Sequence, residues 1–352
     1  IAPHSDLPPV SPRTAAVLER YRRHRDAIRG AGAIVGKGRL AFAADGCVRC
    51  GMCMTGCPYS LIYSARHTFD RLIHQRRITY IRGAMATRVD ESADGKPSVH
   101  AIDIRTGRMI RIDGERVFIG AGGLGTTRIA LNSLRNPPRY TEFQESVQFL
   151  VPFLSRHGTG DPRSQQDFTL NQFNMLLKFD DEAYTTSQVH CYPFNPAIGD
   201  VLPGWLPQKV SAAILSRLTI GLGYLPSWQS PQMRVELLGR SPNRLPDIAL
   251  RVESNSRPPM LREVLRRLTA LGPRLDLFPV TPMVRMSGPG KSYHYGSTFP
   301  HGRESDLLGR IDAFRNVHLV DGSVLPSVPS TTFTLTVMAN AHRIATEVQR
   351  IA

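Results

Sequence analysis

Four of the five cysteines of this chain lie within eleven residues, and their spacing is one that can hold a metal centre. Residues 47–58 read CVRCGMCMTGCP, so that Cys47, Cys50, Cys53 and Cys57 follow the order Cys-x-x-Cys-x-x-Cys-x-x-x-Cys-Pro. Thiolates with this spacing bind iron–sulfur clusters. Such clustering is typical of a metal or cluster site and not of a scaffold of dispersed disulfides.

The residues alone leave the ligand set of such a centre open. In two-cluster ferredoxins the fourth cysteine of this motif binds the other cluster, and this chain has a single motif. Cys57 would therefore fold back, or Cys191 would come across, or three cysteines would hold the cluster. A zinc site or a pair of disulfides is the alternative use of the same thiols.

A second motif lies at residues 120–125, where GAGGLG satisfies G-x-G-x-x-G. It follows the expected strand RVFI and opens an expected helix at residues 126–134, which is the setting of a dinucleotide pyrophosphate site. Such a site also needs an acidic residue at the end of the next strand, but NPPRYTEF follows the helix here. By itself the motif therefore predicts a tight packing turn between a strand and a helix.

Three C-terminal stretches carry a resemblance to a known family. Residues 293–300 (YHYGSTFP), 316–326 (NVHLVDGSVLP) and 339–345 (ANAHRIA) resemble, in this order, the C-terminal region of glucose–methanol–choline (GMC) flavoprotein oxidoreductases. VFIGAGGLGTTRIALNS resembles that family's second strand–turn–helix segment, and RGAMATRV resembles the strand whose backbone meets the adenine. The resemblance covers residues 60–134 and 291–352 and implies FAD as the cofactor.

The resemblance also implies roles for individual residues. His294 takes the place of the active-site base that accepts the hydroxyl proton, a role that suits an imidazole with an ordinary pKa near ~6.5. Thr332 stands where the family usually has a second His or Asn, and its hydroxyl can donate a hydrogen bond to a substrate oxygen. The predicted contacts to the flavin nucleotide are Ala86, Gly120, Ala121, Gly122, Gly125, Asp321, Gly322, Thr332 and Phe333.

Within these contacts, the resemblance places Asp321 and Gly322 along the pyrophosphate and ribityl chain. Thr332 and Phe333 would lie near the pyrimidine edge, at the N-terminus of the closing helix, whose dipole can stabilise an anionic reduced flavin. The cysteine run precedes YSLIYSARHTFDRLI, where some bacterial GMC dehydrogenases carry an iron–sulfur cluster between the flavin and an external acceptor. That position implies a dehydrogenase that passes electrons to a protein such as a cytochrome.

Periodicity predicts helices at residues 13–28, 67–75, 126–134, 258–271 and 334–351, and strands in the β-former-rich runs between residues 78 and 120. The expected fold class is α/β (α+β), a Rossmann-like FAD-binding domain of GMC type split around an antiparallel-sheet substrate domain. The expected domains are an N-terminal region with the cysteine segment (1–59), a first FAD-binding segment (60–134), the substrate domain (135–290) and a second FAD-binding segment with His294 (291–352).

The resemblance to GMC oxidoreductases also predicts a partner segment. The family begins with a strand, G-x-G-x-x-G and helix that grip the ADP moiety, and no such segment precedes residue 47. We therefore expect a separate N-terminal FAD-binding segment, without which FAD binds weakly.

Composition argues against two other classes of protein. Lys and Arg outnumber Asp and Glu by 44 to 29, but the basic residues are scattered and form no nucleic-acid-binding arm. The apolar stretches are too short to span a membrane. The chain starts at Ile1, so the sequence leaves its localisation open, whether cytoplasmic or exported in folded form.

The predicted function is an FAD-dependent dehydrogenase that oxidises a CH–OH group of an alcohol or sugar by hydride transfer, with electrons leaving through an iron–sulfur cluster. The alternative is a non-catalytic fragment or electron-transfer subunit.

Overall fold

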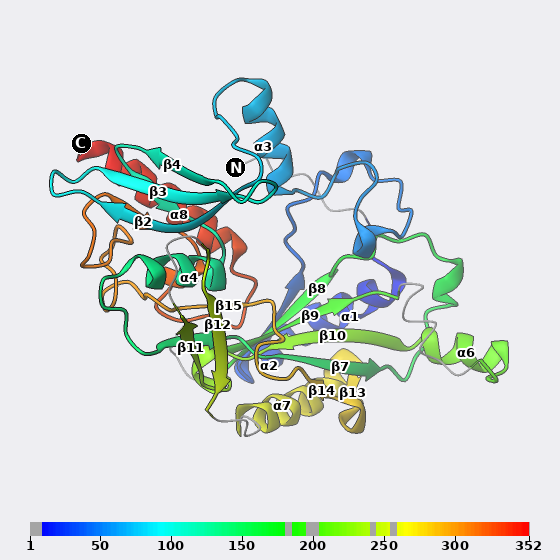
Figure 1. Ribbon diagram of the computed structural model, residues 1–352. Coiled ribbons are helices and arrows are strands. Elements are labelled where there is room, and N and C mark those ends of the chain that lie inside the picture. The colour runs from blue at the N-terminus through cyan, green and yellow to red at the C-terminus, as the bar shows by residue number, and fades with distance from the viewer. Residues whose placement is uncertain (1–8, 180–184, 195–203, 240–243, 254–258, 352) are drawn as a thin grey trace. The chain divides into compact units, whose positions relative to one another are not determined.

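The computed structural model describes residues 9–179, 185–194, 204–239, 244–253 and 259–351. The chain forms two compact units, each assembled from three separate segments. Unit 1 comprises Ile1–Thr79, Gln148–Tyr224 and Pro259–Met286, and unit 2 comprises Tyr80–Val147, Leu225–Pro258 and Ser287–Ala352. Figure 1 shows the elements by label and by colour along the chain.

Unit 1 is built on an antiparallel sheet with seven described strands, in the order β1-β8-β9-β10-β7-β13, with β14 also pairing with β7. Along β7 the alternate residues Phe149, Val151 and Phe153 are almost fully buried, as expected for a strand with one face on the core, and Pro152 is buried as well. The strands are β1 (Ala33–Lys37), β7 (Gln148–Leu154), β8 (Phe173–Lys178), β9 (Thr186–Tyr192), β10 (Leu218–Tyr224), β13 (Phe278–Pro279) and β14 (Arg285–Met286).

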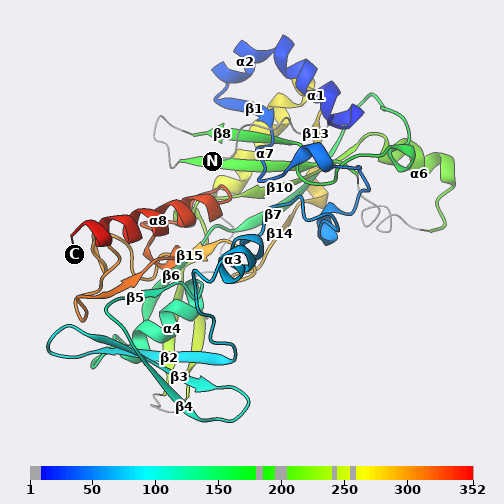
Figure 2. The same cartoon turned by 90° about the horizontal axis from the view of Figure 1, so that it is seen from above.

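Two helices of unit 1, α1 and α3, begin at a serine that caps their N-terminus. Ser11 accepts a hydrogen bond from the Thr14 N–H and Pro12 opens the first turn of α1, and Ser64 caps α3 in the same way. Helix α1 packs against α7 and β1, and Figure 2 shows α1 and α2 on one side of the sheet. The helices are α1 (Pro12–Arg23), α2 (Arg25–Gly30), α3 (Ala65–His74), α6 (Gln208–Leu215) and α7 (Pro259–Leu275).

Unit 2 contains three small sheets among its described residues. They are an antiparallel β2-β3-β4 sheet, a parallel β5-β16 pair and a four-stranded β12-β11-β6-β15 sheet. The strands are β2 (Ala84–Glu91), β3 (Pro97–Asp103), β4 (Met109–Asp113), β5 (Val117–Ile119), β6 (Thr141–Glu145), β11 (Met233–Leu238), β12 (Asp247–Val252), β15 (Tyr295–Gly296) and β16 (Val317–Leu319).

Helix α4 (Gly123–Ser133) connects these sheets, because it contacts β2, β11 and β15. Its buried Ile129, Ala130 and Leu131 form one core cluster with residues of β2, β5 and β16. The chain closes with α8 (Thr334–Arg350), whose Ile344 and Val348 are buried.

Helices form at all five predicted places, although the run predicted as one helix at residues 13–28 is divided at His24 into α1 and α2. The mixed helix and antiparallel-sheet architecture agrees with the predicted fold class. The strand expected at residues 78–83 (ITYIRG) does not form. Its Ile78, Tyr80 and Ile81 are exposed, so these β-forming side chains are not packed on a half-buried sheet surface, which is the setting that β-propensity reflects. The bounds of the two units also differ from the predicted domains, since residues 60–79 belong to unit 1 and residues 135–147 and 225–258 to unit 2.

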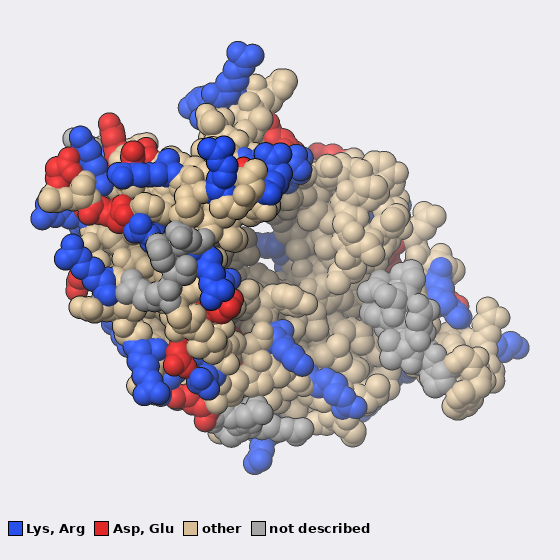
Figure 3. All heavy atoms as spheres, viewed as in Figure 1, with Lys and Arg blue, Asp and Glu red and all other residues tan. Residues whose placement is uncertain are grey.

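The surface shows no single-sign stripe on the face seen in Figure 3, where basic side chains are dispersed and many lie beside acidic ones. Ion pairs of the described residues include Arg251 with Glu236 and Arg310 with Asp306. In the described part of the chain, no helix is both long and apolar enough to cross a bilayer.

Candidate active site

Two turns of unit 2 lie at the same edge of the parallel β5-β16 pair. Val117 pairs with Val317 and Ile119 with Leu319, so the segments that follow both strands emerge side by side. One is the GAGGLG turn into α4, and the other is the turn at Asp321. In α/β folds, the carboxyl ends of parallel strands are where ligands bind.

A threonine of α4 joins these two turns. Thr126 Oγ1 accepts a hydrogen bond from the Ala121 N–H (3.0 Å) and donates one to Asp321 Oδ2 (2.5 Å). The other carboxylate oxygen, Asp321 Oδ1, accepts the Ser323 N–H (2.9 Å). Because Thr126 and Asp321 are both buried, these bonds fix the turns to each other.

The glycines of the GAGGLG turn do two different things. A Cβ on Gly125 would lie 3.2 Å from Ala121 Cβ, and one on Gly120 would lie 3.4 Å from Val320, so both positions serve close packing. Gly122 precedes α4 with φ +80°, a conformation that favours glycine, and a Cβ there would meet nothing within 4 Å. The predicted packing turn between a strand and a helix is therefore present. At Gly122 the space that a side chain would occupy is empty.

The loop that carries His294 lies directly against the Asp321 turn. Ser297 N–H donates to the Gly322 carbonyl (2.9 Å), and a Cβ on Gly296 would lie 2.1 Å from the same Gly322 oxygen. Only glycine permits this approach. The contact brings His294, two residues earlier, next to the second turn.

His294 is half-buried and packs edge-on against Phe333, with ring centroids 5.3 Å apart. Burial lowers the pKa of His294 to about 4. The imidazole is therefore neutral and able to accept a proton at neutral pH. Phe333 immediately precedes α8, whose N-terminus has no side-chain cap, and Thr332 is exposed just before it.

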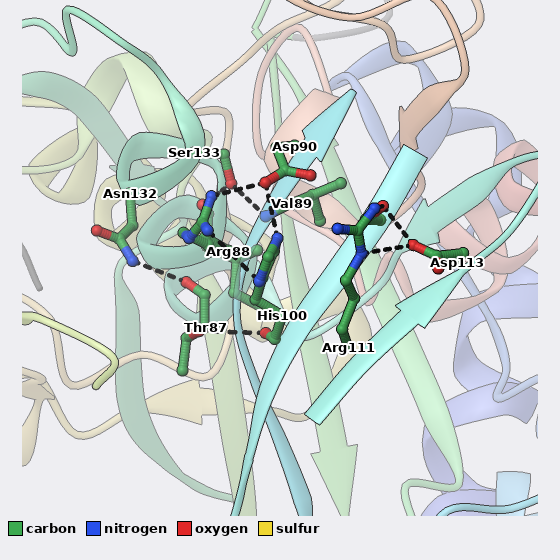
Figure 4. Close-up of polar contacts among 11 residues, drawn as sticks. Thr87, Arg88, Val89, Asp90, His100, Arg111, Asp113, Asn132 and Ser133 are labelled. Carbon is green, nitrogen blue, oxygen red and sulfur yellow. Dashed lines mark hydrogen bonds and ion pairs between the residues drawn. The ribbon is translucent and has the colours of Figure 1, made fainter. Parts of the chain in front are cut away.

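Ala86 lies on β2, which α4 holds in place through side-chain to backbone hydrogen bonds. Asn132 Nδ2 donates to the Thr87 carbonyl (3.0 Å), and the Val89 N–H donates to Ser133 Oγ (2.8 Å). Figure 4 shows these contacts beside an Arg88–Asp90–His100 network on the same sheet. Ala86 itself is half-buried against the core of unit 2.

The cysteine segment belongs to unit 1, and its thiols are free. Cys53 Sγ accepts the Thr169 N–H (3.3 Å), and Cys50 lines a cavity of about 700 Å³. Across the described residues, no three His, Cys, Asp or Glu side chains are grouped so as to hold a metal ion. The predicted set Cys47, Cys50, Cys53 and Cys57 is therefore not arranged as cluster ligands.

Cys191, the other ligand considered, lies in a different environment. It is fully buried in β9, and burial raises the pKa of its thiol well above the usual value. For Cys57, burial works against ionisation, but hydrogen bonds from backbone N–H groups of residues 59–62 lower the pKa of its thiol. The thiol pKa values of Cys57 and Cys191 are thus shifted in opposite directions.

The residues of unit 2 fit a flavin nucleotide. Ser323 Oγ is buried and has no hydrogen-bond partner among the described residues, and the N-termini of α4 and α8 have no side-chain caps. Uncapped N–H groups at helix starts suit a phosphate or an anionic ring edge. Ser323 lies in the turn that follows Asp321, α4 starts directly after Gly122, and a Cβ on Gly322 would lie 3.3 Å from the ring of Phe333, which precedes α8.

Comparison with known proteins supports a flavoenzyme fold. No protein-family model matches the chain, and no curated protein matches it. Among solved structures it is similar to pyridoxine 4-oxidase from Mesorbium loti, with a TM-score of 0.61 and 13% identity over 98% of this chain and 71% of that one. It is also similar to an FAD-dependent oxidoreductase from Chaetomium thermophilum in complex with a small-molecule fragment, with a TM-score of 0.51 and 13% identity over 82% of this chain and 65% of that one.

The chain thus spans only a portion of the length of each of these proteins. At such low identity the similarity shows the fold, which is that of FAD-dependent oxidoreductases, as the sequence predicts.

The sequence does not predict three residues that lie near His294 in the structure. Glu145, Ser146 and Ser292 contact the loop of His294, as described below. No local motif marks them, because their role depends on the pairing of β6 with β15.

Proposed function

We propose that this chain belongs to an FAD-dependent dehydrogenase that oxidises a CH–OH group of an alcohol or sugar. The observation that carries the proposal is the half-buried imidazole of His294, which packs on Phe333 at the start of α8 and lies beside the Asp321 turn. The flavoenzyme fold supports the same conclusion. One protein of similar fold is named as an oxidase of pyridoxine, which is consistent with a small-molecule substrate.

In this proposal His294 removes the proton of the substrate hydroxyl through a ring nitrogen. Its lowered pKa keeps the imidazole unprotonated before the reaction, so that it is ready to act as a base. When bound, FAD would accept the hydride from the carbinol carbon. Thr332, exposed next to Phe333, can donate a hydrogen bond to the substrate oxygen and hold it toward His294.

The nucleotide would be held by the two linked turns. We assign Asp321 and Gly322 to the pyrophosphate and ribityl chain, and Thr332 and Phe333 to the pyrimidine edge. The remaining contacts are Ala86, Gly120, Ala121, Gly122 and Gly125. The uncapped start of α8 would stabilise negative charge on the ring system.

Electron exit through an iron–sulfur cluster, and with it a cytochrome-like acceptor, stays a prediction from cysteine spacing. The four thiols are not grouped as ligands, so we assign no step to them. Iron and acid-labile sulfide assays on anaerobically purified protein decide the point. Stoichiometric iron and sulfide would support the spacing, whereas zinc without sulfide would indicate a structural site.

The proposed activity is tested by titrating FAD into the protein and then adding a panel of alcohols and sugars without oxygen. The titration is made with and without a supplied N-terminal ADP-binding segment, because we expect FAD to bind the chain weakly when that segment is missing. With the segment present, we expect FAD to bind and at least one CH–OH donor to bleach the flavin absorbance. Failure of FAD to bind at saturating concentration even then would favour the electron-transfer or non-catalytic alternative. Binding without reduction by any CH–OH donor would contradict the substrate class.

A further inference from the structure

A buried carboxylate lies beside the His294 loop. Glu145, the last residue of β6, is fully buried. Its Oε1 accepts the Gly290 N–H (3.0 Å) and its Oε2 accepts the Ser292 hydroxyl (2.9 Å). Neither donor is charged, and no ion pair of the described residues includes Glu145. Burying a carboxylate is costly without hydrogen bonds, so these two bonds are what makes this position tolerable.

Both donors belong to the segment that leads into His294, and the neighbours of Glu145 hold the segment that follows. The Ser146 N–H donates to the His294 carbonyl (2.8 Å), and Ser292 Oγ lies 3.2 Å from the same oxygen. Tyr295 then pairs with Glu145 across β15 and β6. Residues on both sides of His294 therefore contact Glu145 and Ser146, at the end of β6 and directly after it.

We infer that Glu145 is a positioning residue for His294: its carboxylate holds the Gly290–Ser292 turn and so fixes the backbone from which the imidazole reaches Phe333. The inference rests on the proposed function in giving His294 a catalytic task. A displacement of a catalytic group by about 1 Å can cost about 100-fold in rate. The loop contacts of Glu145 thus act on catalysis without touching the substrate.

Replacements of Glu145 and Ser292 differ in which of these hydrogen bonds they keep. Glu145→Ala removes both acceptors. Glu145→Gln keeps the shape: its carbonyl can accept the Gly290 N–H, while its amide donates to Ser292 Oγ, whose own proton then turns to the His294 carbonyl. The neutral isostere should therefore rescue the loop. Ser292→Ala removes one of the two bonds. Glu142→Ala, at an exposed position on the same strand, is the matched control.

The decisive measurement needs no flavin. In protein labelled with ¹³C-histidine, the His294 signal is assigned by its loss in His294→Ala, and its contact with the Phe333 ring and its titration midpoint are recorded. We expect Glu145→Ala to weaken the ring contact and to move the midpoint from about 4 toward the ordinary value, because the imidazole loses burial. Ser292→Ala should move it in the same direction by less, and Glu145→Gln and Glu142→Ala should leave it unchanged.

In flavin-loaded protein, Glu145→Ala should slow flavin reduction at saturating substrate by about 100-fold while the substrate dissociation constant stays close to that of the wild type. A folded Glu145→Ala variant with unchanged ring contact and midpoint would overturn the inference. If that variant does not fold, unchanged signals in Ser292→Ala overturn it instead. Altered signals in a protein that oxidises no CH–OH donor would contradict the proposed function and leave the positioning role standing.

Discussion

His294 is kept neutral by its surroundings, and this decides which step it can perform. Replacing it by alanine should leave FAD binding intact but slow flavin reduction by substrate by roughly 10²–10⁴-fold, the usual effect of losing a general base. Single-turnover reduction in a stopped-flow instrument measures this. His342→Ala, at an exposed position on α8, is the control and should behave as the wild type. An unchanged reduction rate in His294→Ala would remove this residue from the mechanism.

The depressed pKa of His294 also predicts the acid limb of the rate. The base must be unprotonated, so flavin reduction should rise with pH through about 4 and stay level toward neutrality. An imidazole with an ordinary pKa would place this limb near ~6.5 instead. Rates measured between these two values separate the cases, and a midpoint near the ordinary value would contradict the burial seen here.

For single residues, the sequence predicts those that stand in a recognisable motif. It does not predict those that acquire a role only when two distant strands pair. His294 and Asp321 stand in short sequence patterns that can be recognised without any knowledge of the fold. Glu145 stands in TEFQES, an ordinary strand, and acquires its role only because β6 pairs with β15. Such a contact between distant segments has no local signature.

Among the elements, the link between α4 and the Asp321 turn should carry measurable stability. Thr126→Val keeps the shape of the side chain but leaves the Ala121 N–H and the Asp321 carboxylate short of one buried partner. We expect the free energy of unfolding to fall by about 1–3 kcal/mol, as measured by urea denaturation. Thr336→Val, on the exposed side of α8, should change the free energy of unfolding little. An equal loss in both variants would show that the hydrogen bonds of Thr126 do not stabilise the fold.

The cysteines should divide into two classes by reactivity. Cys50 is exposed, and the thiol pKa of Cys57 is lowered by backbone N–H groups, whereas Cys191 is fully buried in β9 with a raised pKa. We expect a thiol reagent to label residues of the 47–57 segment in the native protein and Cys191 only after unfolding. Mass spectrometry of labelled peptides reads this out, and early labelling of Cys191 would contradict the sheet placement.

Helix positions follow well from the sequence because a 3.6-residue apolar period and capping residues are local properties. The helices predicted at residues 67–75 and 258–271 form as α3 and α7, and in the structure Ser11 and Ser64 cap the starts of α1 and α3. Strand positions follow less well. Residues 78–83 have the composition of a strand, but their Ile78, Tyr80 and Ile81 are exposed, and composition alone does not show whether a segment will be packed into a sheet.

For the molecule as a whole, the division into units is the least predictable feature, since each unit combines three distant segments. In unit 1, Asp276 joins all three. It is buried with φ +54°, accepts the backbone N–H of Arg156 (2.9 Å) and the His157 ring nitrogen (2.9 Å), and faces Arg20 at 4.0 Å. A sequence pattern does not show that these segments converge on one carboxylate.

Asp276→Asn tests this junction, because asparagine tolerates the same backbone conformation but lacks the charge and one acceptor. Burial opposes ionisation of Asp276, yet hydrogen bonds from His157 and Arg156 lower its pKa overall. Its contribution is therefore present above the ordinary carboxyl pKa of about 3.9 and lost as the pH falls through the lower folded-state value.

At neutral pH the variant should lose about 1–3 kcal/mol of unfolding free energy, and the difference from the wild type should shrink in acid. Urea denaturation followed by circular dichroism at several pH values measures both. Asp45→Asn, at an exposed position of unit 1, is the control. A deficit that does not depend on pH would show that the carboxylate charge is not what holds the segments together.

The pairing of β5 with β16 also sets an order for biosynthesis. Unit 1 has received its last segment when the ribosome has added Met286, whereas unit 2 still lacks everything from Ser287 onward. Until residues 317–319 emerge, β5 has no strand to pair with and Thr126 has no Asp321 to bond. Unit 1 can therefore fold during translation, while the turns that would hold the flavin close only after residues 317–321 have been added.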